Sequence, residues 1–162
     1  MEYLSGIIAF GIPCRDNSCG IWNYTKEQFT DENLLKPYNS EQYPFGDYGI
    51  EENKIIPYHE DEELFNVATH IRAYLDMLVE NRFEELKGMF EQAINDGKCR
   101  GKIFSLVYDK LRARDDFMPI HMFMAEEFGN AWLSYCQDET GREMRMQEKA
   151  AKMAAWVTKG QK

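Results

Sequence analysis

The sequence feature that most restricts the fold is a run of regularly spaced apolar residues between Asp61 and Asn95. Apolar side chains recur there at steps of three and four residues, which aligns them along one side of an α-helix. Such a side is stable only when another surface covers it, so we expect the rest of the chain to pack around this run. The apolar positions are Leu64, Val67, Ala68, Ile71, Leu75, Leu78, Val79, Phe83, Leu86, Met89, Phe90, Ala93 and Ile94.

Single residues in this run predict where its helices begin and end. Asp61 is suited to accept hydrogen bonds from the free N–H groups at the start of a helix. Asn81 is a weak helix former, so we expect a first helix to end there and a second to run from Phe83 to Asn95. Gly97 is expected to end the second helix in a conformation with positive φ.

Further helices are expected toward the C-terminus. Pro119 fits the first turn of a helix, and Thr140 with Glu143 forms the spacing of a capping box. One stretch, IFSLVY, also fits a strand, but its length and its helical neighbours favour a helix. The expected ranges are Lys102–Arg114, about Asp116 to Cys136, and Thr140–Val157.

The first sixty residues follow a different pattern. Alternating apolar residues predict a strand from Tyr3 to Ile12, and a turn-rich stretch leads to a second strand at Gly20–Thr25, which together form a β-hairpin. Lys54–Tyr58 is expected to be a short third strand at a sheet edge. Between them, Lys26–Asn53 contains closely spaced turn signals, and we expect an irregular excursion with at most one helical turn near Lys26–Phe29.

These patterns predict an α+β fold in a single domain of residues 1–162. A small N-terminal antiparallel β-hairpin or three-stranded sheet is expected to pack on a C-terminal bundle of four to five α-helices. Residues 1–60 form the β and irregular aromatic-rich part, residues 61–157 the helical part, and residues 158–162 a frayed tail. A chain of this length buries roughly 70% of its unfolded surface, so its core needs no metal or disulfide.

Charge and hydropathy restrict the partners and the compartment. The net charge is −9, and residues 1–60 hold 4 Lys or Arg against 10 Asp or Glu. This acidic balance disfavours nucleic-acid binding, which depends on positive contacts to phosphates. The N-terminus lacks the basic region of a secretory signal, and no apolar run is long enough to cross a bilayer. We therefore expect a cytoplasmic protein with reduced thiols and no membrane association.

An aromatic cluster in the N-terminal part is the leading candidate for a binding surface. Its residues are Trp22, Tyr38, Tyr43, Phe45 and Tyr48, and aromatic side chains of this kind either fill a core or form protein-binding surfaces. We interpret the chain as a non-enzymatic interaction or regulatory module with a protein partner. Because the predicted last helix is long, rich in alanine and sparse in apolar positions, a homodimer through the helical part is a further possibility.

Two alternatives remain open at the level of sequence. The first is a small enzyme or ligand-binding domain with a pocket between the sheet and the helices. It would use a carboxylate, or Cys14 or Cys19 with His59, His70 or His121. Whether the chain is an enzyme is therefore undecided, although no catalytic motif is present. The cysteine and histidine spacings do not match a structural zinc site, so we expect no metal and no cofactor.

The second alternative is anion or nucleic-acid binding by basic residues before a predicted helix. Lys98, Arg100 and Lys102 alternate there with two glycines. Backbone N–H groups at a helix start together with cationic side chains are able to hold a phosphate. The stretch lacks the spacing of a P-loop, and further basic residues follow as far as Arg114.

Overall fold

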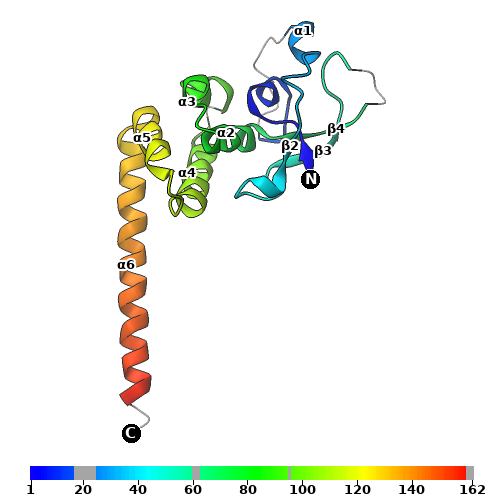
Figure 1. The fold of residues 1–162 in the computed structure, drawn as a ribbon. Coiled ribbons are helices and arrows are strands. Elements are labelled where there is room, and N and C mark those ends of the chain that lie inside the picture. The colour runs from blue at the N-terminus through cyan, green and yellow to red at the C-terminus, as the bar shows by residue number, and fades with distance from the viewer. Residues whose placement is uncertain (17–24, 60–62, 95, 160–162) are drawn as a thin grey trace. The chain divides into compact units, whose positions relative to one another are not determined.

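The computed structural model describes residues 1–16, 25–59, 63–94 and 96–159. Within these ranges the chain has an α+β fold, with two two-stranded antiparallel sheets and a largely helical remainder (Figure 1). The predicted α+β class is thus confirmed, whereas the single hairpin or three-stranded sheet is replaced by two separate two-stranded sheets. The chain forms two compact units, Met1–Phe123 and Met124–Lys162. Each unit is described by itself.

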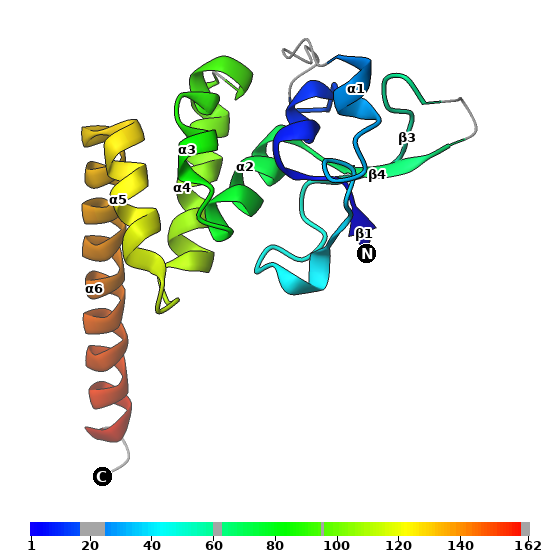
Figure 2. The same ribbon diagram turned by 45° about the horizontal axis from the view of Figure 1, so that its top comes forward.

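Helix α2 (His70–Val79) is the central element of the first unit. Every residue from His70 to Leu78 is buried, as expected of a helix that is covered on all sides. In both ribbon views α2 lies between the strands and helices α3 (Phe83–Leu86) and α4 (Gly97–Leu111) (Figures 1 and 2). The expectation that other elements pack around the run between residues 61 and 95 is confirmed for α2, which contacts α3 and α4 directly.

The start of this helix differs from the prediction. Asp61, the expected N-cap, lies outside the described residues, and the helix begins at His70. Thr69 is the N-cap, since its side chain accepts a hydrogen bond from the backbone N–H of Arg72. The preceding residues form strand β4 (Phe65–Ala68), which pairs antiparallel with β3 (Ile50–Lys54). The periodicity through Val67 and Ala68 was misleading because a distant strand, not a local pattern, determines their conformation.

The interruption expected near Asn81 is confirmed, since Asn81 has a φ of 58° just after α2 ends. The second helix is itself divided. Helix α3 stops at Leu86, Gly88 has a φ of 73°, and a π-helical stretch, η3, covers Phe90–Ile94.

The predicted role of Gly97 at the end of a helix is wrong. Gly97 is the first residue of α4, and the side chain of Asp96 caps this helix by accepting from the backbone N–H of Lys98 at 2.8 Å. Glycine and aspartate before a basic stretch fit a helix start as well as a helix end. The helix expected over Lys102–Arg114 is confirmed, although it begins earlier and ends at Leu111.

The predicted strand Tyr3–Ile12 is also wrong. Strand β1 comprises only Glu2–Tyr3, and a 3-10 helix, η1, follows at Gly6–Gly11. Gly6 has a φ of +71°, which an L-residue rarely adopts and which turns the chain out of the strand. Apolar residues occur at nearly every position of this segment and most of them are buried. The apparent alternation therefore did not distinguish a buried face of a strand from a solvent-exposed one.

Strand β1 pairs antiparallel with β2 (Tyr38–Asn39) instead of with the next segment of the chain. The predicted partner strand, Gly20–Thr25, lies outside the described residues except for Thr25. Thr25 itself caps the single helical turn α1 (Lys26–Phe29) through a capping box with Gln28, so the expected turn is confirmed.

The irregular region also contains elements that were not expected. A 3-10 turn, η2, covers Ser40–Gln42, and β3 begins at Ile50. The predicted third strand, Lys54–Tyr58, is wrong because β3 ends where that strand was expected to begin. Pro57 lacks an N–H for strand pairing, and Tyr58 has a φ of 66°, which is incompatible with a strand.

Helices continue to the end of the described chain. Helix α5 (Phe117–Phe128) crosses the boundary between the units and ends at Gly129, whose φ is 54°. Helix α6 (Asn130–Lys159) then runs without a break. The single helix expected to reach Cys136 and the new start expected at Thr140 are therefore both wrong. Gly129 supplies the positive φ at the real break, whereas Thr140 lies inside a continuous helix. Among the described residues, every helix is too short or too polar to span a bilayer.

Candidate functional site

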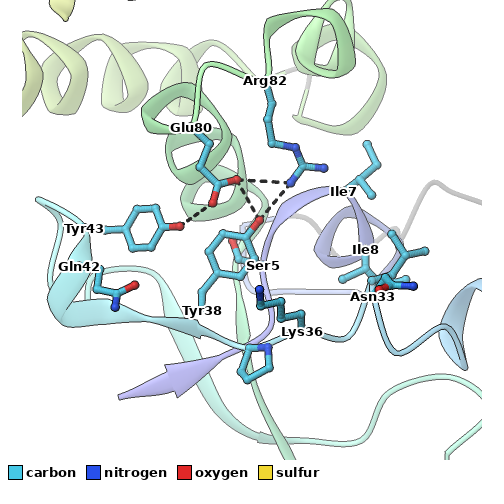
Figure 3. A pocket seen from close by; sticks show the side chains of 12 residues that line it. Ser5, Ile7, Ile8, Asn33, Lys36, Tyr38, Gln42, Tyr43, Glu80 and Arg82 are labelled. Atoms are coloured by element: carbon cyan, nitrogen blue, oxygen red, sulfur yellow. Dashed lines mark hydrogen bonds and ion pairs between the residues drawn. The ribbon is translucent and has the colours of Figure 1, made fainter.

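A pocket of about 290 Å³ opens in the first unit beside the C-terminal end of α2 (Figure 3). Its lining comes from η1, from the segment that leads into β2, from η2 and from the two charged residues that follow α2. We call it the tyrosine pocket. The residues that line it are Ser5, Ile7, Ile8, Asn33, Leu34, Lys36, Pro37, Tyr38, Gln42, Tyr43, Glu80 and Arg82.

Two tyrosines and one glutamate form the most ordered part of the tyrosine pocket. The rings of Tyr38 and Tyr43 lie with their centroids 5.6 Å apart. The hydroxyl of Tyr38 donates to Glu80 Oε2 at 3.1 Å, and the hydroxyl of Tyr43 donates to Glu80 Oε1 at 2.7 Å (Figure 3). Each carboxylate oxygen is thus held by a different ring, which fixes both rings relative to the end of α2.

Arg82 completes this network and is itself neutralised. Its Nη1 donates to the Tyr38 hydroxyl at 3.0 Å and lies 3.5 Å from Glu80 Oε2. Its Nε and Nη2 donate to the two oxygens of Glu85 at 2.7 and 2.6 Å, a bidentate pair. The hydrogen bond to Glu85 raises the pKa of Arg82, and the same bond lowers the pKa of Glu85.

The tyrosine hydroxyls of the pocket are held in their protonated form. Burial raises the pKa of Tyr38 well above its usual range, and the nearby charge of Glu80 raises it further. For Tyr43, burial is again the main cause and the hydrogen bond to Glu80 is the second. At neutral pH both phenols therefore stay protonated. Each donates a hydrogen bond to Glu80, and neither serves as a general base.

The rest of the lining combines one cation with apolar surface. Lys36 is exposed, and its ammonium has no ion-pair partner within the described ranges. Ile8 is buried, while Leu34 is half-buried and adds apolar area. The pocket thus offers a free positive charge, an ordered carboxylate and an apolar contact within one small volume.

A second network, one turn earlier on α2, attaches the irregular region to this helix. Arg72 donates from Nε to Asp76 Oδ1 at 2.7 Å and from Nη2 to the Tyr3 hydroxyl at 2.6 Å. Its Nη1 donates to the backbone carbonyls of Gly46 and Tyr48. Arg72 and Asp76 are both fully buried. We call this set the Arg72 network.

The carboxylate of Asp76 receives hydrogen bonds on both oxygens. Oδ1 accepts from Arg72, while Oδ2 accepts from the hydroxyls of Tyr3 at 2.8 Å and Ser5 at 2.7 Å. Burial raises the pKa of Asp76, whereas the charge of Arg72 and the three hydrogen-bond donors act in the opposite direction and favour the ionised form. Because Arg72 also holds the carbonyls of Gly46 and Tyr48, this network fixes the loop that carries Tyr43.

The four described aromatic residues of the predicted binding surface have different surroundings. Tyr38 and Tyr43 line the tyrosine pocket together. Phe45 is buried, with its ring centroid 5.6 Å from the Arg72 guanidinium. The ring of Tyr48 lies under the ammonium of Lys102 at 5.3 Å, and Trp22 lies outside the described residues.

The basic residues considered for anion binding lie in the first turns of α4. Lys98 and Arg100 are exposed, and Lys102 contacts the Tyr48 ring. The carboxylate of Asp96 already accepts the N–H of Lys98, so it occupies the position that a bound anion would take. Among the described residues at this helix start, nothing else indicates a ligand.

The cysteines and histidines considered for catalysis are placed differently. Cys14 is buried beside His70, and Cys19 lies outside the described residues. His59 contacts Glu63 Oε2 and the carbonyl of Phe29, each at 2.8 Å, and His121 lies 5.8 Å from the Phe117 ring. Of these residues, the described ones do not line the tyrosine pocket. Across the described ranges, no three carboxylate, imidazole or thiol groups are arranged to hold a metal ion.

Glu80 and Arg82 were not identified from the sequence. They follow the last turn of α2, where charged residues commonly meet solvent, and nothing in their spacing marks a site. Their partners Tyr38 and Tyr43 lie about forty residues earlier in the chain, at separations of 42 and 37 residues from Glu80. Only folding connects the two segments.

Comparison with protein-family models, with curated proteins and with solved structures finds no significant match to this chain. The geometry of the described residues is therefore the basis for a functional proposal.

Proposed function

We propose that this protein is a non-enzymatic binding module that recognises a short segment of a partner protein in its tyrosine pocket. The observation that carries this proposal is the pair of half-buried rings, Tyr38 and Tyr43, held by Glu80 on the wall of an open pocket. Rings that are already fixed lose little conformational entropy when a ligand packs on them. Such pre-organisation favours recognition.

The segment that best matches this lining carries an apolar side chain next to a carboxylate. Leu34 and Ile7 are half-buried and provide apolar contact, and the ammonium of Lys36 is available to pair with a negative charge. A volume of about 290 Å³ accepts one side chain with its adjoining backbone. This volume lies at the lower end of the range of small-molecule and cofactor pockets, which is about 300 to 1,000 Å³.

Polar groups of the lining are suited to a peptide backbone. The side-chain amide of Gln42 both donates and accepts, which matches the N–H and C=O groups of an extended segment. Glu80 has acceptor capacity beyond the bonds it makes with the tyrosines. A backbone N–H of the partner directed at Glu80 would extend the network that already orders this wall.

The lining favours binding over catalysis. General acid–base chemistry at neutral pH needs a group that gains or loses a proton near pH 7. The raised pKa values keep Tyr38 and Tyr43 protonated, and the Glu80 carboxylate is engaged by donors on both oxygens. Among the lining residues there is no cysteine or histidine to act as nucleophile or base.

A peptide-display selection against the full chain tests this proposal. Enriched peptides would be measured by fluorescence anisotropy against the wild type and three variants. Lys36→Gln should weaken binding by roughly 10-fold, because it removes a charge-assisted contact worth about 1.5 kcal/mol or more. Tyr43→Phe removes a single hydroxyl from the wall and should weaken binding less. The matched control is Lys98→Gln, which removes another exposed lysine outside the pocket and should leave the affinity unchanged.

The outcomes separate the competing interpretations. Enriched peptides with an acidic residue next to an apolar one, whose affinity falls in Lys36→Gln but not in Lys98→Gln, would support the proposal. A selection that enriches no peptide, or peptides that bind equally well to all the variants, would refute it. Loss of binding only in Lys98→Gln would favour the basic start of α4 instead.

Self-association through the second unit is a separate proposal with its own observation. Met146, Ala150 and Met153 follow one another on α6 at steps of four and three residues and are exposed. This spacing is typical of a helix that pairs with a second helix. Sedimentation velocity over a range of concentrations should detect a dimer, and a Met146→Glu, Met153→Glu double variant should abolish it. A concentration-independent monomer would refute this proposal.

A further inference from the structure

His70 lies fully buried between two groups that only accept hydrogen bonds. Its Nδ1 is 3.2 Å from the carbonyl oxygen of Ala93, and its Nε2 is 3.0 Å from the carbonyl oxygen of Ile12. A neutral imidazole carries a single N–H, so one of its nitrogens would direct a lone pair at a carbonyl lone pair. Both contacts are favourable only when the ring is an imidazolium.

A buried imidazolium requires a negative charge nearby, and Cys14 is placed to supply it. The Cys14 sulfur accepts a hydrogen bond from the backbone N–H of His70 at 3.4 Å. This N–H belongs to the first residue of α2, where the helix dipole favours an anion and lowers the pKa of a thiol. Burial lowers the pKa of His70, but Cys14 and the two carbonyls outweigh burial and raise it above its usual value.

We propose that Cys14 is a thiolate paired with the His70 imidazolium, and that it is a modification site for small electrophilic oxidants of the hydroperoxide class. Cys14 retains 7% exposure, which leaves access to a small molecule but not to a protein substrate. Cys14 does not line the tyrosine pocket, so this inference is independent of the binding proposal.

The other described cysteines lie in surroundings that raise their pKa. Burial raises the pKa of Cys99, and the charges of Asp96, Asp16 and Cys14 raise it further. Burial raises the pKa of Cys136 to about 11. Both are thiols at neutral pH and serve as internal controls, because only the thiolate is a strong nucleophile.

The reaction with a hydroperoxide is a simple displacement. The Cys14 sulfur attacks the terminal peroxide oxygen, an S–O bond forms and the O–O bond breaks. With hydrogen peroxide, the products are a sulfenic acid on Cys14 and a hydroxide ion, which takes up a proton from solvent to become water. The sulfur is oxidised by two electrons and the peroxide is reduced by two.

Two measurements on the full-length wild type test this proposal. The first is pulsed alkylation with iodoacetamide across a pH series, with peptide mass mapping to separate the four cysteines. Cys14 should react with a midpoint below about pH 7, compared with about 8.5 for an unperturbed thiol. The second is exposure to hydrogen peroxide in the presence of a dimedone-type trap, which should label Cys14 and not Cys99 or Cys136.

The results of both measurements either support or overturn the proposed Cys14 thiolate. A midpoint at or above about pH 8.5, or failure of Cys14 to react with either reagent, would overturn the proposal. His70→Gln should move the midpoint upward by at least one pH unit and slow alkylation near pH 6 by about 10-fold or more. If circular dichroism shows that this variant does not fold, the ¹⁵N shifts of the wild-type His70 ring decide instead. Shifts of an imidazolium at pH 7 support the proposal, and those of a neutral ring overturn it.

Discussion

Two networks built from similar groups, one within α2 and one just after its C-terminal end, differ chiefly in their access to solvent. The Arg72 network joins an arginine, a carboxylate, a tyrosine and a serine, and both of its charged side chains are fully buried. The network of the tyrosine pocket joins an arginine, two carboxylates and two tyrosines, with 27% of Arg82 and 32% of Glu80 exposed. Similar groups thus form one network that is buried and one that reaches solvent.

This difference indicates separate roles for the two networks. In the Arg72 network every charged group is paired inside the core, so no capacity remains for a ligand and removal of one member leaves an uncompensated charge. In the tyrosine pocket the groups are ordered but reach solvent, so they are able to exchange water for a ligand. The first network supports the loop that positions the second. The following predictions test this division of roles.

The largest contrast is expected between two arginine variants. Arg72→Met should lower the free energy of unfolding by about 3–5 kcal/mol, because it leaves the Asp76 carboxylate buried without its partner. Arg82→Met should cost no more than about 1 kcal/mol, since its ion pairs are partly exposed. Urea unfolding measures both. Equal losses in the two variants would contradict the division into a supporting and a ligand-facing network.

Two glycines in the loop that Arg72 holds provide the next contrast. Gly49 has a φ of +71°, and a Cβ added there would lie 2.8 Å from the Arg72 Cβ, whereas Gly46, with a φ of +53°, has open space around it. Gly49→Ala should therefore cost about 2–4 kcal/mol, combining backbone strain with a clash in the core. Gly46→Ala should cost only the backbone strain, about 1–2 kcal/mol. Thermal or urea unfolding would show whether close packing against α2 adds the expected difference.

Alkaline pH should distinguish the two networks through their tyrosines. Burial raises the pKa of Tyr3 above its usual value, so the folded state keeps a phenolic proton that the unfolded state loses above about pH 10. The unfolded state then binds fewer protons, and stability should fall as the pH rises, by up to about 1.4 kcal/mol per pH unit for each such tyrosine. Tyr3→Phe should flatten this fall more than Tyr43→Phe, because Tyr43 is less buried. Urea midpoints measured at several pH values above about 10 test this order. A larger flattening in Tyr43→Phe than in Tyr3→Phe would contradict it.

The smallest effect is expected at His59, which belongs to neither network and whose partner is largely exposed. Its ring contacts Glu63 and the carbonyl of Phe29, and the hydrogen bond to Glu63 raises its pKa. A raised pKa on a base stabilises the fold below the unfolded value of about 6.5, and this contribution is lost as the pH rises through the folded value. Since Glu63 is 59% exposed, the contribution should stay below about 1 kcal/mol. His59→Gln should thus be less stable than wild type near pH 5.5, with the gap closing near pH 8.5. A gap that widens with pH would contradict this sign.

Part of the candidate site could be predicted from sequence. Tyr38 and Tyr43 were expected to contribute to a binding surface because aromatic residues are concentrated in an irregular region. Glu80 and Arg82 could not be found in this way, since their importance depends on contact with residues far earlier in the chain. The burial of Phe45 under Arg72 was equally inaccessible, because a local pattern cannot show which aromatic ring faces a core and which faces a pocket.

The sequence by itself determined the α+β class, the break in helix near Asn81 and the helical conformation of α1 and α4. These features depend on periodicity, caps and helix-breaking residues that act within a few positions of one another. Only the tertiary structure decided that Phe65–Ala68 is a strand, that β1 pairs with β2, and that α2 carries a buried network while the residues after it form one that reaches solvent. Those outcomes depend on pairing and burial between distant segments. Their free energies arise only once the chain has folded, so no local pattern records them.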